Sequence, residues 1–421
     1  MRRLLPLSFG LAAVSAAVLA TGQAVSAQEE GPPEALTPGS HLEVYLVTAG
    51  PGDAIWERFS HNAIRIVDRR FNTDIAYNWG IFDFRQESFI KRLAQGRMLY
   101  AMDGIDWGAM AGSYIAADRA LYQHPIALTG PEKLELQRTL QAMDVDGLRD
   151  YRYDYYRDNC STRVRDALDA VLGGVIVERW DAVPTETTYR WHTRRLTWPA
   201  AWAYFGIQFV VGNPGDEPLS AADEMFLPLK LMQYLEQTEI DRGDGPVPLL
   251  GERMDLHRSS RPDVRAAPPG MLIPALLLGL LVGGLLLGFG RSAEEGSVLG
   301  RTGLALVGGA WFLIFGLLGT GLMAAWLFTD HVFWTWNENV FSINPLGLIV
   351  VPLLVLAAMN GRWERLAGIA RILAGLSVLG LVLQVLPGFD QVNGEIAALV
   401  LPANLALALA TDRLSRLSRA T

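Results

Sequence analysis

Cysteine is almost absent from this chain of 421 residues, which contains a single thiol, Cys160. One thiol cannot form an intramolecular disulfide, and it cannot supply the several sulfur ligands of a structural zinc or iron–sulfur site. We expect no metal ion and no cofactor. Lysine is also scarce, and the formal net charge is −8 at pH 7, so the charge gives no reason to expect nucleic acid as a partner.

Charged residues make up only 19% of the sequence, while hydrophobic residues make up half of it. The apolar excess lies at the two ends of the chain. Residues 1–27 combine a basic start, an apolar core and small residues before Gln28, which is typical of a signal peptide; the alternative is an uncleaved anchor. From Met271 onward, five apolar stretches approach the ~20 residues that span a bilayer as a helix. These stretches are 271–290, 303–328, 345–359, 366–387 and 396–411.

The charges between these stretches indicate their orientation. If the signal peptide is cleaved, residues 28–270 lie outside and the first helix runs inward. The two loops then expected outside, about 329–343 and 388–395, contain no lysine or arginine, whereas the segments expected inside contain seven arginines. The sequence therefore predicts a multi-pass membrane protein with an exported N-terminal domain (28–270), a transmembrane helical domain (271–421) and a cytoplasmic C-terminus.

The exported domain is acidic, since residues 28–270 carry 26 basic and 36 acidic side chains, a net charge of −10. Its overall charge will not hold it against anionic lipid headgroups. Residues 28–40 are rich in proline, glycine and glutamate, which predicts a flexible segment, and residues 241–270 are predicted to be the approach to the membrane.

Hydrophobic periodicity predicts an α+β arrangement within this domain. Alternating residues predict strands, of which the second and third form a hairpin. Spacings of three and four predict helices. The expected strands are His41–Thr48, Asn62–Val67 and Asp74–Gly80, and the expected helices are Phe84–Gln95, Pro131–Met143 and Asp158–Val171, with mostly helical structure over 186–240.

Cys160 lies in the sequence Asp-Asn-Cys-Ser-Thr, at the start of a predicted helix. Asp158 or Asn159 is a suitable N-cap, which places Cys160 in the first helical turn. There the free backbone amides and the helix dipole favour a thiolate, and the same amides are possible donors to an oxyanion. The polar neighbours favour a catalytic thiol over the alternative of a buried structural cysteine.

A thiolate nucleophile needs a base, and the chain offers six histidines. His61 is the preferred partner because it opens a predicted strand. Asn78, on the next strand, is a candidate for orienting its ring; the alternative is an asparagine that only ends the strand. The predicted catalytic residues are therefore Cys160, His61 and Asn78. Candidate substrate-binding residues beside the cysteine are Tyr155, Arg157 and Asn159.

A strand histidine followed by a helix cysteine reverses the papain order and resembles the circularly permuted NlpC/P60 papain-like group. The segments FSHNAIRI, YNWGIFDF, YRYDYYRDNCSTRVRDAL, EMFLP (Glu224–Pro228) and FTDHVFWTWNENVFSINPLGL (Phe328–Leu348) resemble the DUF4105 family of Lnb-type lipoprotein N-acyltransferases, over most of residues 41–348. The resemblance implies an α+β, circularly permuted papain-like (NlpC/P60-type) periplasmic domain followed by an all-α transmembrane bundle of about five helices in a bacterial inner membrane. It also implies a dyad of Cys160 and His61, but Asn78 remains a geometric inference.

The resemblance further implies an acyltransferase that moves an acyl chain through a thioester on Cys160 to the N-terminal amine of a lipoprotein. Membrane lipids and lipoprotein N-termini would be its substrates. Two alternatives stay open: a cysteine hydrolase acting on peptidoglycan stem peptides or on lipid esters, and a non-enzymatic membrane scaffold. In the loop at 329–344, His331, Asn337 and Asn339 are candidates for holding a lipid headgroup or the acceptor amine; the alternative is that the loop's tryptophans form an interfacial belt.

Overall fold

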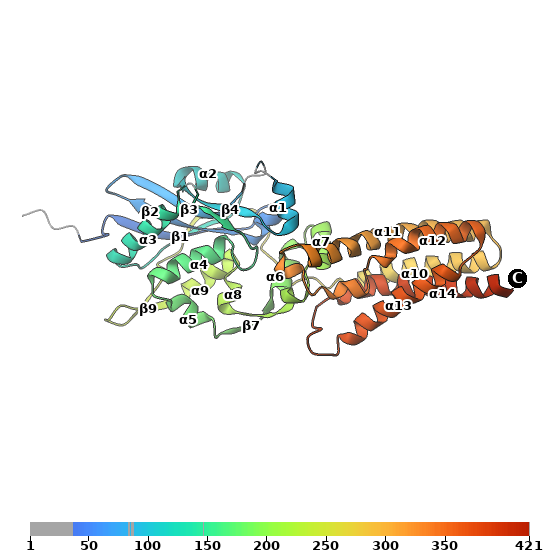
Figure 1. Ribbon diagram of the computed structural model, residues 1–421. Coiled ribbons are helices and arrows are strands. Elements are labelled where there is room, and N and C mark those ends of the chain that lie inside the picture. The colour runs from blue at the N-terminus through green and yellow to red at the C-terminus, as the bar shows by residue number, and fades with distance from the viewer. Residues whose placement is uncertain (1–36, 83–84, 86–87, 146, 421) are drawn as a thin grey trace, which may run out of the picture. The chain divides into compact units, whose positions relative to one another are not determined.

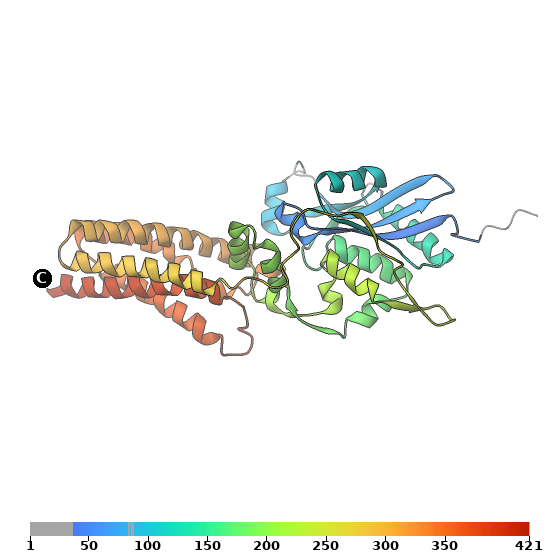
Figure 2. The same ribbon diagram turned by 180° about the vertical axis from the view of Figure 1, so that it is seen from behind.

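The computed structural model describes residues 37–420 apart from 83–84, 86–87 and 146 (Figures 1 and 2). The predicted signal peptide and most of the predicted flexible segment lie outside these residues. Below, the N-terminal domain is residues 38–270 and the membrane domain is residues 271–420. Both domains belong to one compact unit, Pro38–Thr421.

The N-terminal domain is built on a seven-stranded antiparallel sheet with the strand order β11-β5-β1-β2-β3-β4-β6. The three predicted strands are confirmed as β1, β2 and β3, and β2 pairs with β3 as the predicted hairpin. The sequence did not predict the other four, because aspartates and a glycine interrupt the apolar pattern of β4 and because β11 lies in the Gly- and Pro-rich approach to the membrane. The strands are β1 (Leu42–Ala49), β2 (His61–Asp68), β3 (Thr73–Ile81), β4 (Leu99–Asp106), β5 (Leu121–Pro125), β6 (Asp150–Arg152) and β11 (Met254–His257).

Helices cover both faces of this sheet, because successive strand residues point to opposite sides. Leu46 and Ile64 pack with α3 (Gly130–Met143), α4 (Cys160–Val171) and α9 (Pro228–Glu236) into the main core. Val47, Ala63 and Ala76 face the opposite way, toward α2 (Trp107–Ala116), which the sequence did not predict. Figure 1 shows α2 and α4 on opposite sides of the strands. The sheet thus has α3, α4 and α9 on one face and α2 on the other.

The remaining predicted helices are confirmed with adjusted limits. The predicted helix at Phe84–Gln95 begins later, as α1 (Phe89–Gln95), and its predicted first residue, Phe84, lies outside the described residues. Residues 186–240 are mostly helical as predicted, with short strands between the helices. The elements after α4 are α5 (Val175–Trp180), β7 (Pro184–Thr188), α6 (Tyr189–Thr197), α7 (Ala201–Val210), β8 (Pro218–Ser220), α8 (Ala221–Glu224), β9 (Glu239–Asp241) and β10 (Pro246–Pro248).

The membrane domain contains five helical segments that are long and apolar enough to cross a membrane, the third counted together with the turns before it as Val332–Asn360. This confirms the five predicted stretches. Close packing depends on small residues: a Cβ atom on Gly279 of α10 would lie 2.5 Å from the Leu399 carbonyl oxygen of α14. The helices are α10 (Leu272–Glu294), α11 (Val298–Phe328), α12 (Leu346–Asn360), α13 (Glu364–Leu383) and α14 (Gly394–Ala420).

Candidate active site

The N-terminus of α4 is capped by Asn159, as predicted. Its Oδ1 accepts hydrogen bonds from the amides of Ser161 at 2.8 Å and Thr162 at 3.1 Å, and its Nδ2 donates to two carbonyls. Two of the backbone amides that the sequence predicted as oxyanion donors are therefore already hydrogen-bonded to the cap. The amide of Cys160 itself is not used by this cap.

A buried hydrogen bond fixes the start of α4 against the start of β2. The Ser161 hydroxyl lies 3.0 Å from Asn62 Oδ1 and 2.6 Å from the Met225 carbonyl, and Asn62 Nδ2 in turn donates to the Thr48 hydroxyl at 2.8 Å. Ser161 directly follows the cysteine, and Asn62 directly follows His61. The bond therefore fixes the backbone beside both predicted catalytic residues.

His61 and Asn78 form the predicted hydrogen bond, with 3.1 Å between Nε2 and Oδ1. Asn78 Nδ2 donates to the Ala76 carbonyl at 2.8 Å, so its oxygen faces the ring and the imidazole carries its proton on Nε2. Nδ1 then keeps its lone pair, and no hydrogen bond between described residues uses it. Burial lowers the pKa of His61 to about 4, although the bond to Asn78 acts in the opposite direction. The ring is therefore neutral at pH 7 and can accept a proton.

The Cys160 thiol is also neutral at rest, because burial raises its pKa to about 11. The backbone amides of Asn62, Ser161 and Cys160 itself hydrogen-bond to the sulfur and act in the opposite direction. The expectation that the helix start yields a thiolate is thus wrong for the resting protein, since desolvation outweighs the amides. The Asn62 amide brings the sulfur close to the backbone beside His61. Within the described part of the chain, however, no hydrogen bond joins the thiol and the imidazole.

Arg119 is a buried cation near this pair that the sequence analysis missed. It is 5% exposed, it donates to the Gly50 carbonyl at 2.8 Å, and its guanidinium lies 4.8 Å from the centre of the Tyr114 ring. Its positive charge contributes to lowering the pKa of both Cys160 and His61. Its position before β5, in a stretch with no predicted element, gave no sequence signal for this role.

Cys160 and His61 line one cavity of about 440 Å³, a volume within the usual range of ligand pockets. Most of its lining is aromatic or aliphatic, and part of it comes from the loop between α11 and α12. The N-terminal domain contributes Trp56, Phe59, Trp79, Phe82, Tyr100, Tyr153, Tyr155, Ile207 and Val210, and the loop contributes Asp330, His331, Val332 and Trp334, among others. The membrane domain is therefore more than an anchor, because it forms part of the cavity wall.

The predicted ligand residue His331 lies in this wall. Its Nε2 is 2.9 Å from the Leu93 carbonyl, and its ring stacks on Trp334 with 3.9 Å between ring centres. Gly96, at φ 69°, allows this approach, because a Cβ atom there would lie 2.8 Å from the His331 backbone nitrogen. Because one face of its ring is stacked and its Nε2 is already bonded, His331 forms part of the cavity wall.

Asn337 and Asn339 do not line the cavity, which corrects their assignment as ligand residues. Both are buried, and their Nδ2 atoms donate at 2.9–3.2 Å to carbonyls of Gln208, Phe209 and Val210. These carbonyls belong to the last turn of α7, where a helix has no partners of its own. The two asparagines therefore cap α7 and fasten the loop to the N-terminal domain.

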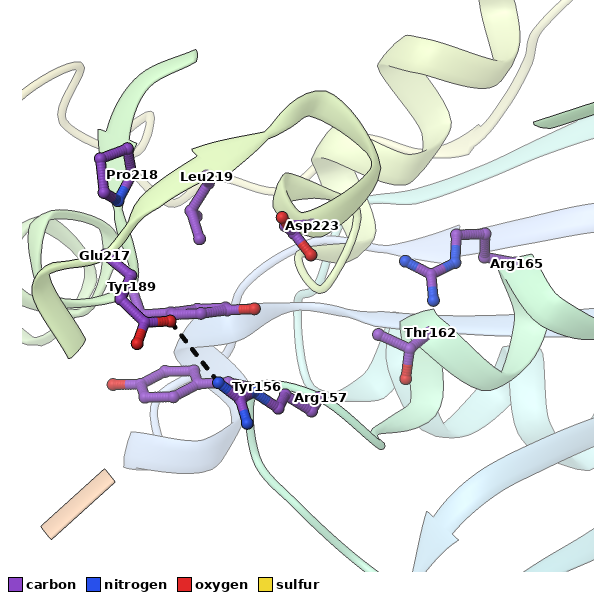
Figure 3. A pocket seen from close by; sticks show the side chains of 9 residues that line it. All are labelled: Tyr156, Arg157, Thr162, Arg165, Tyr189, Glu217, Pro218, Leu219 and Asp223. Carbon is purple, nitrogen blue, oxygen red and sulfur yellow. Dashed lines mark ion pairs between the residues drawn. The ribbon is translucent and has the colours of Figure 1, made fainter. Parts of the chain in front are cut away.

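Arg157 also lies outside the cavity, in a polar pocket of about 250 Å³ that contains arginines and acids together (Figure 3). It pairs with Glu217 at 3.6 Å, and its guanidinium lies 5.0 Å from the centre of the Phe333 ring. Tyr155 and Asn159 do line the cavity that contains Cys160 and His61, but the side chain of Asn159 is committed to the cap. Among the described residues, no group of three or more His, Cys, Asp or Glu side chains is arranged to hold a metal ion.

The fold and the site together define a membrane protein with an α/β N-terminal domain. Its only thiol and a neutral imidazole line one apolar cavity, and a loop of the membrane domain forms part of the wall. Residues 34–195 match the Lnb N-terminal periplasmic domain, and residues 280–389 match the Lnb transmembrane domain. The chain is an Lnb-family membrane protein with a periplasmic and a transmembrane domain, which indicates an inner-membrane location. Searches of curated proteins and of solved structures give no match. The permuted papain-like fold stays a prediction.

Proposed function

We propose that this protein is a thiol acyltransferase that moves an acyl chain from a lipid ester to the N-terminal amine of a bacterial lipoprotein. The observation that carries the proposal is the cavity: the only cysteine and a neutral histidine open into an apolar space whose wall includes a loop between membrane helices. Such a space suits a hydrocarbon chain, and the loop connects it to the region where lipid substrates reside. The family resemblance supports the same chemistry.

The first step forms the thioester. As Sγ of Cys160 attacks the ester carbonyl carbon, the lone pair on Nδ1 of His61 accepts the thiol proton, so a neutral pair becomes reactive only when the substrate is present. The amide of Cys160, which the Asn159 cap leaves free, is the proposed donor to the oxyanion. The carbon–oxygen bond to the lipid alcohol breaks, and the imidazolium returns the proton to that alcohol.

The second step forms the amide. The lipoprotein amine attacks the thioester carbonyl, His61 takes one proton from the nitrogen, and the sulfur leaves and is protonated again. Asn78 keeps the ring in the orientation and tautomer that both steps need, through its bond to Nε2. We also propose that the N-terminal domain lies in the periplasm and the C-terminus in the cytoplasm. In this orientation the loop that lines the cavity faces the periplasm, on the same side as the N-terminal domain.

The test uses the purified full chain with a diacylglyceryl lipopeptide and a phospholipid whose acyl chains are isotopically distinct. The wild-type protein should yield the N-acyl lipopeptide, and the label will show which lipid donated the chain. Cys160→Ala and His61→Gln should abolish the product, whereas His41→Gln, a histidine change outside the cavity, should not. Undiminished transfer by Cys160→Ala would refute the proposal. Release of free fatty acid alone, or cleavage of peptidoglycan peptides, would replace it with a hydrolase.

A further inference from the structure

A second cavity of the N-terminal domain, of about 730 Å³, has a charge opposite to that of the domain around it. Its lining contains twice as many arginines as aspartates, although residues 28–270 have a net charge of −10. The arginines are Arg58, Arg195, Arg253, Arg258, Arg261 and Arg265, and the aspartates are Asp53, Asp255 and Asp263. A local excess of cations in an acidic domain indicates a site for an anion.

Three of these arginines, Arg58, Arg195 and Arg265, have no carboxylate partner among the described residues. Arg253 and Arg258 pair with Asp255, and Arg261 pairs with Asp53. By contrast, no ion pair within the described residues involves the other three.

Arg58 and Arg195 are partly buried, so leaving their positive charges without a counter-charge is energetically unfavourable. Arg58 Nε is buried and has no hydrogen-bond partner in the described structure. Arg195 donates to Nδ1 of His192 at 3.0 Å and to the Arg265 carbonyl at 3.3 Å, and burial lowers its pKa. The charge of Glu224 acts on Arg195 without forming an ion pair and offsets only part of the effect of burial. A partly desolvated guanidinium with no anion in direct contact is unfavourable, so a ligand that supplies one would be stabilised.

The cavity lies beside both the active site and the path into the membrane. Arg58 belongs to the 3₁₀ helix Ile55–Phe59 and Arg195 to α6, and the same two elements place Phe59 and Thr193 in the cavity that contains Cys160 and His61. Arg265 comes shortly before α10. Arg194, next to Arg195, pairs with Glu395 in the first turn of α14.

We propose that this arginine-lined cavity binds a phosphate group, with Arg58 and Arg195 as its main ligands. The planar fork of a guanidinium matches phosphate oxygens, and Arg265, which forms no ion pair with a described residue, adds a further donor. A phospholipid headgroup and free inorganic phosphate share this chemistry. The proposal concerns binding alone and does not depend on the reaction at Cys160.

The experiment measures binding to the full chain in detergent. One arm adds phosphatidylglycerol or diacylglycerol with the same acyl chains and counts retained lipid by native mass spectrometry. The other arm follows thermal unfolding in inorganic phosphate and in chloride at equal ionic strength. Arg58→Gln is the cleanest variant, because it removes a cation that holds no described hydrogen bond or ion pair. Arg195→Lys keeps the charge and removes the fork. Arg138→Gln, an exposed arginine of α3 paired with Glu135, is the matched control.

We expect Arg58→Gln to weaken retention of phosphatidylglycerol about tenfold, as the loss of one charge-assisted contact predicts. Diacylglycerol retention and the Arg138→Gln control should not change. A loss seen with phosphatidylglycerol identifies a lipid headgroup as the ligand, and a loss seen only in the phosphate arm identifies free phosphate. If lipid retention and the effect of phosphate on thermal unfolding are the same in Arg58→Gln, Arg195→Lys and the wild type, the proposal is overturned. The same binding in Cys160→Ala would show that the site stands independently of the acyltransferase.

Discussion

The neutral resting state of Cys160 has a measurable consequence for its alkylation. Burial raises the pKa of the thiol to about 11 from an ordinary value of 9.0. This difference leaves about 100-fold less thiolate at pH 7.5 than in the unfolded chain, and the thiolate is the species that reacts with iodoacetamide. The folded protein should therefore be alkylated about 100-fold more slowly than the chain in guanidinium, and its rate should keep rising about tenfold per pH unit toward pH ~10.

Intact mass gives these rates without ambiguity, because the chain has one cysteine. Restricted access would slow the reaction by the same factor at every pH, so it would not move the pH at which the rate levels off. Arg119→Met removes a charge that lowers the thiol pKa, and it should shift the whole curve to higher pH. A rate that already levels off below about pH 7 would refute the reasoning, because it would reveal a preformed thiolate–imidazolium pair.

Three further predictions concern the parts that hold the site. Asn78→Ala removes the acceptor that orients His61, so the proposed acyl-transfer rate, followed by lipopeptide mass, should fall about tenfold or more at saturating substrate; an unchanged rate would remove Asn78 from the mechanism. Gly212→Ala should displace the loop between α11 and α12 and increase its cleavage in limited proteolysis, because the new Cβ atom would lie 2.0 Å from a carbonyl oxygen of that loop. Gly206→Ala, with open space at its Cβ, should behave as wild type. Asn337→Ala leaves the Val210 carbonyl of α7 without its partner, while Phe209 keeps its bond from Asn339, and should destabilise the protein by about 1–3 kcal/mol, seen as a lower Tm; no change would mean that water replaces the side chain.

Local sequence signals predicted the strands and the helix that carry the candidate catalytic residues. The alternation in β1 to β3 and the capping sequence before Cys160 act over a few residues, so the hairpin, the N-cap and the His61–Asn78 bond could all be anticipated. The five membrane helices could be predicted for the same reason, since length and composition decide them.

Long-range contacts and burial were beyond the sequence. The loop asparagines looked like ligand residues because they are polar and lie beside tryptophans, but they cap a helix more than a hundred residues earlier in the chain. The thiol looked activated because a helix start favours an anion, but it is buried, and much of the aromatic wall of its cavity, such as Trp79 and Trp334, comes from distant segments. Arg119 was missed because a single arginine outside any predicted element carries no local pattern.

The central claim is that Cys160 carries the acyl chain as a thioester, and trapping that species tests it most directly. The full chain is mixed with a lipid ester without an acceptor amine, quenched in acid and analysed by intact mass and peptide mapping. The account predicts one added acyl group, located on Cys160 and removed by neutral hydroxylamine. When the reaction is run at neutral pH, the group should be absent from Cys160→Ser and from His61→Gln. An acyl group on another residue, or N-acylation that continues in Cys160→Ala, would contradict the account.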